Sequence, residues 1–123
     1  MNEVDKIYDL EVRCSNFGAL TIRFCKKLTY DTVSKPLISQ LVRSATSVGA
    51  NYMEANAASS KKDFRNKIYI CKKEAQETRH WLKMIYAHEP NTRSDILDLN
   101  QEVHELILIF GKILSAISTE ARI

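Results

Sequence analysis

Glycine and proline, the residues that most often interrupt helices, are scarce in this sequence. The 123 residues include only three glycines and two prolines. Charged residues dilute the aliphatic ones in almost every window, which is typical of long amphipathic helices rather than of strands. An apolar fraction of 45% at this length is enough to build one core. The composition therefore predicts an all-α protein with a single domain over residues 1–123.

Long apolar runs are also missing. No stretch approaches the roughly 18 consecutive apolar residues that a membrane span requires. The first nine residues carry Glu3, Asp5 and Asp9 and lack an apolar centre, so they resemble neither a signal peptide nor a transit peptide. We therefore expect a cytoplasmic protein without a membrane partner.

Paired cysteines are absent as well. Cys14, Cys25 and Cys71 are an odd number without a CxxC pair, and each lies among apolar helical positions. This arrangement favours free buried thiols over disulfides or a zinc site.

The sequence also lacks the patterns of common active sites. His80, His88 and His104 show neither HxxxH nor HExxH spacing. No glycine-rich phosphate loop or GxSxG pattern occurs, and the carboxylates are scattered over helical surface positions. We expect no enzyme, no catalytic residue, no metal and no cofactor, since an enzyme here would need a pocket shared between subunits.

Four segments repeat apolar or small residues at alternating spacings of three and four, which places them on one side of each helix. This pattern suits left-handed bundle packing at about 20°, and short connections make consecutive helices antiparallel neighbours. The expected fold is an antiparallel up-down four-helix bundle with helices at roughly residues 4–31, 35–58, 61–88 and 93–119. The stripes are Ile7, Leu10, Cys14, Phe17, Thr21, Phe24 and Leu28; Ile38, Leu41, Ala45, Val48, Tyr52 and Ala55; Phe64, Ile68, Cys71, Ala75, Thr78, Leu82 and Ile85; and Ile96, Leu99, Val103, Leu106, Phe110, Ile113 and Ile117.

Polar residues and proline mark the helix starts. Ser34 precedes Pro36 by two residues, which predicts a serine N-cap with proline in the first turn of the second helix. Ser60 followed by Asp63 resembles a capping box for the third helix. Pro90 ends the third helix, because a residue that precedes proline is disfavoured in the helical region.

The second predicted helix is rich in small residues and carries one polar strip. Close approach of a neighbouring helix is the simplest reason for Gly49, because glycine inside a helix costs about 1 kcal/mol against alanine. Arg43, Ser47, Asn51 and Glu54 recur at three- or four-residue spacing and therefore share one strip. We interpret this strip as a buried or interfacial hydrogen-bond network, with a ligand site as the alternative.

The third predicted helix has one basic face. When each residue advances by about 100°, five cations fall within roughly 40° of one another, with Tyr69 and Gln76 on the same strip. Three interpretations fit: a face that binds nucleic acid through phosphate contacts, a solvated surface, or a set of pairs with Glu102 and Glu105 of the fourth helix. The basic face consists of Lys61, Arg65, Lys72, Arg79 and Lys83.

The same helix carries a second apolar strip of Ile70, Trp81 and Met84. A protein surface rarely leaves such a strip in water. We interpret the strip as an interface between subunits, and stacking of nucleic-acid bases on Tyr69 and Trp81 is the alternative.

One segment of the second helix carries a family resemblance. The pattern R-S-A-x-S-x-x-A-N-x-x-E runs from Arg43 to Glu54, through Ser44, Ala45, Ser47, Ala50 and Asn51. With the following Ser60-Lys61-Lys62-Asp63-Phe64, it resembles the bacterial four helix bundle protein family. Members of that family were first noticed as open reading frames in intervening sequences of large-subunit ribosomal RNA genes. The family includes the accessory variability determinant of diversity-generating retroelements.

The resemblance implies a homopentameric ring of four-helix bundles without catalysis. For the retroelement members it also implies binding of nucleic acid and of a reverse transcriptase. Many relatives have glycine at the position of Ala55 and arginine at that of Ala58, so this chain has no counterpart of that arginine.

Two functional hypotheses follow. The first is a non-enzymatic homo-oligomeric scaffold or adaptor that binds RNA or DNA through the basic face, together with a nucleic-acid enzyme such as a reverse transcriptase. The second is a protein-binding or self-assembling module with no nucleic-acid role, in which the basic face meets acidic groups of the same or the next subunit.

Overall fold

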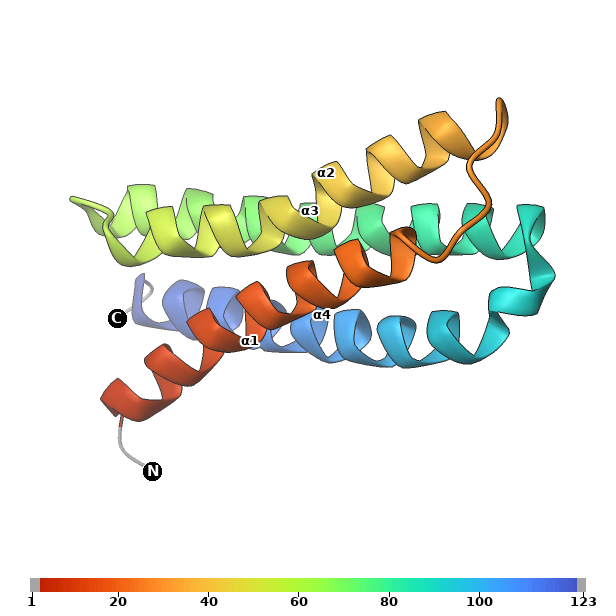
Figure 1. Ribbon diagram of the computed structural model, residues 1–123. Helices are drawn as coiled ribbons and strands as arrows, with labels where there is room; N and C mark the ends of the chain where they lie inside the picture. The colour runs from red at the N-terminus through yellow and green to blue at the C-terminus, as the bar shows by residue number, and fades with distance from the viewer. Residues whose placement is uncertain (1–2, 122–123) are drawn as a thin grey trace.

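The computed structural model describes the backbone of residues 3–121 and the side chains of residues 10–118. It contains four α-helices and no strand within that range (Figure 1). They are α1 (Glu3–Cys25), α2 (Ser34–Asn56), α3 (Lys61–His88) and α4 (Arg93–Ala121), and the short 3-10 helix η1 (Pro90–Thr92) precedes α4. Consecutive helices run in opposite directions, so the predicted up-down four-helix bundle is confirmed. Ile7 of the first predicted stripe lies outside the described side chains.

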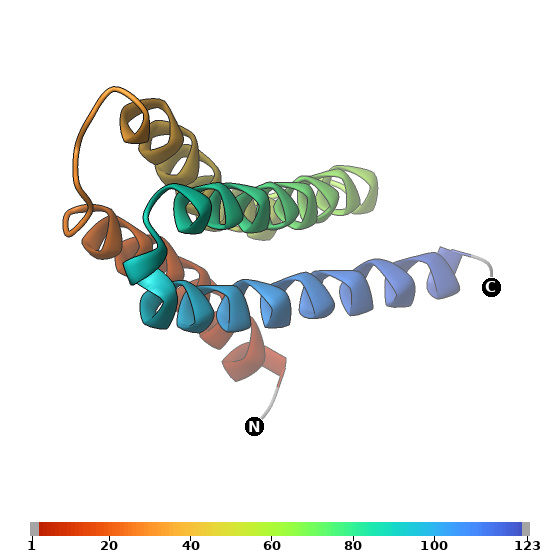
Figure 2. The same cartoon turned by 90° about the vertical axis from the view of Figure 1, so that its right-hand side faces the viewer.

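Backbones approach most closely between neighbouring helices, and diagonal helices meet through core side chains such as Tyr52 of α2 and Phe110 of α4, whose ring centroids lie 6.2 Å apart. The contact between α2 and α3 is the most extensive, and that between α1 and α4 is the smallest, because α1 runs obliquely across α4 (Figures 1 and 2). The core follows the predicted stripes, and burial of each large side chain there contributes about 1.5–3 kcal/mol. Its fully buried members include Phe17, Leu41, Ile68, Leu82, Val103, Leu106 and Phe110.

The three cysteines lie in this core as free thiols, as predicted. Burial raises the pKa of Cys14 and of Cys71 to about 12 and that of Cys25 to about 11. The reactive thiolate is therefore scarce at neutral pH, which argues against nucleophilic or redox chemistry at these positions.

The first helix is shorter than predicted, because it ends at Cys25 rather than at residue 31. Asp31 forms a cap for the next helix instead. Its Oδ1 accepts hydrogen bonds from the backbone N–H of Val33 at 2.9 Å and of Ser34 at 2.8 Å. These bonds lower the pKa of Asp31, and the bond from Ser34 is the largest cause.

The prediction that Ser34 caps α2 is wrong in consequence. Ser34 is buried, and its hydroxyl accepts from the Asp31 N–H at 2.8 Å and donates to the Thr29 carbonyl oxygen at 2.7 Å. It therefore holds the loop together from inside, while Asp31 satisfies the free N–H groups at the start of α2.

The other helix starts agree with the sequence. The Ser60 hydroxyl accepts from the Asp63 N–H at 3.0 Å, as expected of an N-cap. Pro90 follows α3 and opens η1, and α4 begins at Arg93.

Gly49 marks a close approach of α1 and α2. A Cβ atom built there would lie 3.6 Å from the backbone and from the Cβ of Cys14. This is ordinary van der Waals contact, so the site is close-packed, as expected, and still has room for one methyl group.

Candidate nucleic-acid interface

The basic face lies along α3 beside the stripe of the buried Ile68, Ala75 and Leu82, on the flank toward α4. Four of its five cations are exposed, and Lys72 is half-buried. Within the described part of the chain, none of the five takes part in an ion pair. No acidic side chain of residues 10–118 therefore neutralises their positive charge by direct pairing.

The acidic residues expected to neutralise this face are engaged elsewhere. Arg13 of α1 donates from Nε to Oε2 of Glu102 at 2.8 Å and from Nη2 to Oε1 at 2.7 Å. Its Nη2 also lies 3.4 Å from Glu105. The paired hydrogen bonds to Glu102 raise the pKa of Arg13, and this fork geometry is the strongest form of such a pair. The predicted pairs between the basic face and Glu102 or Glu105 do not form.

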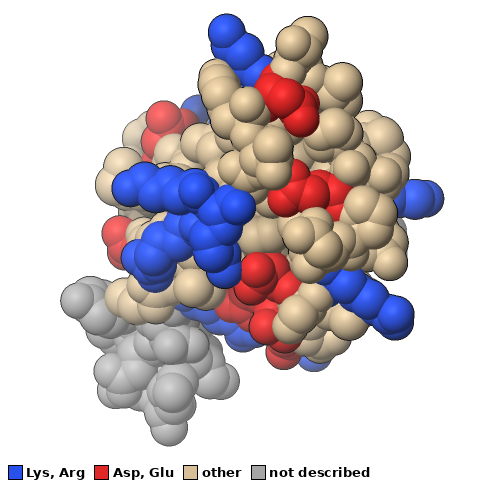
Figure 3. Space-filling view, turned by 45° about the vertical axis from the view of Figure 1, so that its right-hand side comes forward, with Lys and Arg blue, Asp and Glu red and all other residues tan. Residues whose placement is uncertain are grey.

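The face shown in Figure 3 carries one group of neighbouring Lys and Arg side chains at the left, and other Lys and Arg side chains stand singly around the edge, some of them beside Asp and Glu. A group of like charges produces a local positive potential despite a net charge of only +3.

Two hollows lie along the seam between α3 and α4. The first, the Tyr86 hollow, has a volume of about 450 Å³, and the second, the Tyr69 hollow, has about 380 Å³. Each combines an exposed tyrosine of α3 with at least one cation of the basic face and with side chains of α4. The Tyr86 hollow is lined by Arg79, Lys83, Tyr86, Ile96, Leu97, Asn100, Gln101 and His104, and the Tyr69 hollow by Arg65, Asn66, Tyr69, Leu114 and Ser118.

The α4 residues of these hollows were not identified from the sequence. Asn100, Gln101 and His104 follow a spacing of one and three that places them on one side of α4. That spacing indicates a polar side of α4, but it does not predict which neighbouring helix this side faces.

The predicted polar network of α2 needs correction. Arg43 is exposed and donates to Gln40 at 3.1 Å, to Glu74 at 2.9 Å and to Glu77. Its pKa is raised, chiefly by the hydrogen bond to Glu77. Glu54 bonds to a different partner, Lys67, at 3.0 Å, and this bond is the main cause of a raised pKa of that lysine. Arg43 and Glu54 thus belong to two separate bridges at the edge of the α2–α3 contact.

The two middle residues of the polar strip, Ser47 and Asn51, form hydrogen bonds to the backbone of their own helix. Ser47 donates to the Arg43 carbonyl oxygen at 2.6 Å, and Asn51 donates to that of Ser47 at 2.9 Å. One enclosed polar contact between α2 and α3 is a hydroxyl pair, in which Thr78 Oγ1 lies 2.9 Å from Ser44 Oγ and both residues are fully buried.

The apolar strip of α3 is largely covered by the chain itself. Ile70, Trp81 and Met84 are half-buried. Trp81 packs against the core and lies edge-on to His80, with ring centroids 4.8 Å apart. Its indole Nε1 is buried without a hydrogen-bond partner. Trp81 is thus partly covered by its own chain, and the subunit interface predicted for the strip of Ile70, Trp81 and Met84 stays a prediction.

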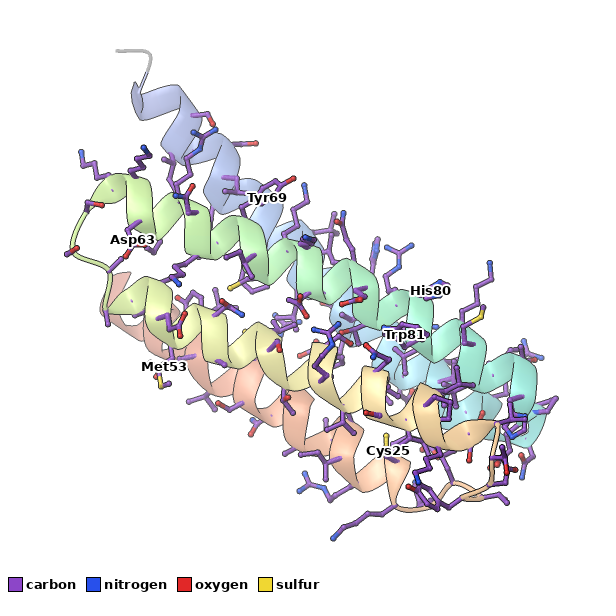
Figure 4. All side chains as sticks on the ribbon, turned by 90° about the horizontal axis from the view of Figure 1, so that it is seen from above. Cys25, Met53, Asp63, Tyr69, His80 and Trp81 are labelled. Carbon is purple, nitrogen blue, oxygen red and sulfur yellow. The ribbon has the colours of Figure 1, made fainter. Side chains whose placement is uncertain are left out.

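A different apolar surface lies between α1 and α2. This α1–α2 groove has a volume of about 350 Å³ and is floored by small residues, among them Gly18 and Ala50. Ile22 and Met53 on its rims are 39% and 58% exposed, and Figure 4 shows Met53 pointing away from the bundle. Large apolar side chains left in water beside a groove of small residues are typical of a contact surface.

The described residues form neither a metal-binding cluster nor a membrane span. Among them, no group of three or more His, Cys, Asp or Glu side chains could hold a metal ion. None of the helices in that range combines the length and the apolarity that a membrane span requires.

Fold and surface together define a small all-α bundle protein with a basic face along α3. The chain belongs to the 23S rRNA-intervening sequence protein family, whose model matches residues 12–112. It is similar to a protein of unknown function from the S23 ribosomal protein family of Bacteroides thetaiotaomicron, whose crystal structure is known at 1.70 Å resolution. The two share 31% sequence identity and a TM-score of 0.82, over 89% of this chain and 98% of the other. No curated protein matches the chain.

The separate bridges of α2 lead to a prediction for stability. Arg43→Ala should lower the free energy of unfolding by about 1 kcal/mol or less, as expected for exposed ion pairs. Because Arg43 and Glu54 have different partners, their alanine variants should be additive within about 0.3–0.5 kcal/mol. Arg43 and Glu74 should instead couple by about 0.5–1 kcal/mol. Urea unfolding of the single and double alanine variants at fixed chain concentration measures the coupling in both pairs. Strong coupling between Arg43 and Glu54 would contradict two separate bridges and support a single network.

Proposed function

We propose that this protein is a non-enzymatic homo-oligomeric adaptor that binds nucleic acid through the basic face of α3. The observation that carries the proposal is the lack of any acidic partner for these five cations among the described residues, while Arg13 occupies Glu102 and Glu105. A row of free cations along one helix suits a chain of phosphates, since each contact releases condensed counterions.

Several features support weak sequence specificity. Lys and Arg on an exposed helix face reach phosphate oxygens, which position a nucleic acid without reading its sequence. The sequence carries no base-reading motif. Assembly into a ring would repeat the basic face, so several phosphates would be neutralised at once and binding would depend steeply on salt.

The family adds a biological setting to this proposal. Its members are named after intervening sequences of 23S ribosomal RNA, which is compatible with an RNA ligand and a cytoplasmic location. For the retroelement members of the family that the sequence resembles, the resemblance implies a reverse transcriptase as the binding partner. We include such a nucleic-acid enzyme as a proposed partner of the adaptor.

A titration by fluorescence anisotropy tests the nucleic-acid role. Labelled RNA and DNA are titrated at about 50 and 200 mM salt, the range over which multi-phosphate binding falls steeply. The variant Arg65→Ala, Lys72→Ala, Arg79→Ala should bind much more weakly than the native protein. Its log–log salt slope should be shallower by about two to three units for each subunit that contacts the probe.

A matched variant tests whether binding depends on where the cations lie or only on the net charge of the protein. Arg23, Lys26 and Lys35 are exposed cations on and near α1 and α2 that make no ion pair among the described residues. Replacing these three by alanine removes the same charge and should leave most of the binding intact. Equal losses in the two variants would assign binding to net charge alone, and no binding at the lower salt would remove nucleic acid from the function.

The alternative function, a self-assembling or protein-binding module, is favoured by the α1–α2 groove. Assembly and nucleic-acid binding are compatible, because the groove and the basic face lie on different helices. We propose that a second copy covers this groove within a ring, with a pentamer as the resemblance implies. Support comes from the exposed rims of the groove and from the coverage of Trp81 by its own chain.

Light scattering coupled to size exclusion tests the assembly. The native protein should elute as an oligomer, and Met53→Glu should shift it to smaller species with unchanged helix content. Tyr30→Glu, at an exposed loop residue, is the control and should keep the oligomer. Loss of the oligomer in Met84→Glu instead would move the interface to the Ile70, Trp81 and Met84 strip, and a native monomer at micromolar concentration would exclude assembly.

A further inference from the structure

The two hollows between α3 and α4 each hold an exposed aromatic ring beside the basic face. Tyr86 is 38% exposed and Tyr69 is 63% exposed. Both project from α3 toward side chains of α4, and Figure 4 shows Tyr69 on the side of α3 that faces away from α2. Phosphate binding alone does not require either ring.

The lining of the Tyr86 hollow has the chemistry that a nucleobase needs. Tyr86 and the 55%-exposed Leu97 supply apolar surface. Asn100 and Gln101 supply amide donors and acceptors, which can bond to base edges. Lys83 supplies the adjacent charge for a phosphate.

The Tyr69 hollow repeats part of this arrangement. Arg65 and Asn66 lie beside Tyr69, and Leu114 of α4 provides the apolar wall. Bases in a duplex are stacked on both faces and are closed to such rings, whereas bases of a single strand are free to stack on aromatic side chains.

We infer that the ligand of the basic face is single-stranded nucleic acid, with one base stacked on Tyr86 and another on Tyr69. This inference rests on the proposed function, because the cations between the two hollows hold the intervening phosphates. Stacking is tolerant of sequence, which agrees with a face that lacks base-reading motifs.

The spacing of the hollows sets a length requirement. Tyr69 and Tyr86 are 17 positions apart on one helix, or about 25 Å at a rise of about 1.5 Å per residue. A stacked strand that rises about 3.4 Å per nucleotide covers this distance with about seven nucleotides. Affinity should therefore rise sharply between strands of about four and about eight nucleotides.

The test compares strands with and without bases. The native protein, Tyr86→Ala, Tyr69→Ala and the conservative Tyr86→Phe are titrated with labelled oligothymidylate and oligouridylate of about twelve nucleotides, an abasic strand of equal length and a duplex. Each alanine variant should bind the two base-bearing strands about 5- to 150-fold more weakly. Tyr86→Phe should bind as the native protein does, since the ring is retained.

The controls distinguish this inference from the proposed function. Tyr30→Ala removes an exposed tyrosine far from the basic face along the chain and should change nothing. Binding of the abasic strand and of the duplex should be equal in all variants, and circular dichroism confirms that each is folded. Equal affinity for abasic and base-bearing strands, with no effect of either alanine variant, would overturn stacking and leave phosphate binding standing. No binding of any probe at about 50 mM salt would overturn both.

Discussion

The ion pair between Arg13 and Glu102 determines how charge is distributed over this bundle. The fourth helix packs against both α1 and α3. Its Glu102 and Glu105 lie on the side of α1, where Arg13 holds Glu102 through two hydrogen bonds and also lies close to Glu105. The five cations of the basic face make no ion pair among the described residues, and the proposed function depends on this.

Different pairs of helices form the different surfaces of the bundle. The stripes of all four build the core, α3 and α4 together present cations, aromatic rings and amides along one seam, and α1 and α2 present an apolar groove. An adaptor needs two kinds of surface, one for its ligand and one for its own assembly. The bundle presents one candidate surface for each of these roles.

The fold was largely predictable from the sequence because the spacing of apolar residues fixes which side of a helix is buried. The end of α1 was not predictable, because it depends on contacts from distant parts of the chain. The Thr29 N–H donates to Glu89 at 3.1 Å, and His88 lies 3.2 Å from Asp31. These contacts hold residues 26–33 as a loop against the end of α3, although the local sequence would allow another helical turn.

The candidate site was predictable only in part, for a similar reason. A helical wheel placed the basic residues on one face of α3, since the angles within one helix are fixed. It could not say how α4 is rotated relative to α3. That rotation decides whether Glu102 meets a lysine of α3 or Arg13, and whether Asn100 lies beside Tyr86. For the same reason Arg43 and Glu54 share a strip of α2 without sharing partners.

Lysine footprinting by mass spectrometry tests most directly whether nucleic acid lies on this seam. The native protein is acetylated under mild conditions with and without a single-stranded oligonucleotide, and the modification of each lysine is compared. Strand binding should protect Lys61, Lys72 and Lys83 of the basic face and leave Lys26 and Lys35 as reactive as in the free protein. Uniform protection, or protection confined to Lys26 and Lys35, would contradict the account.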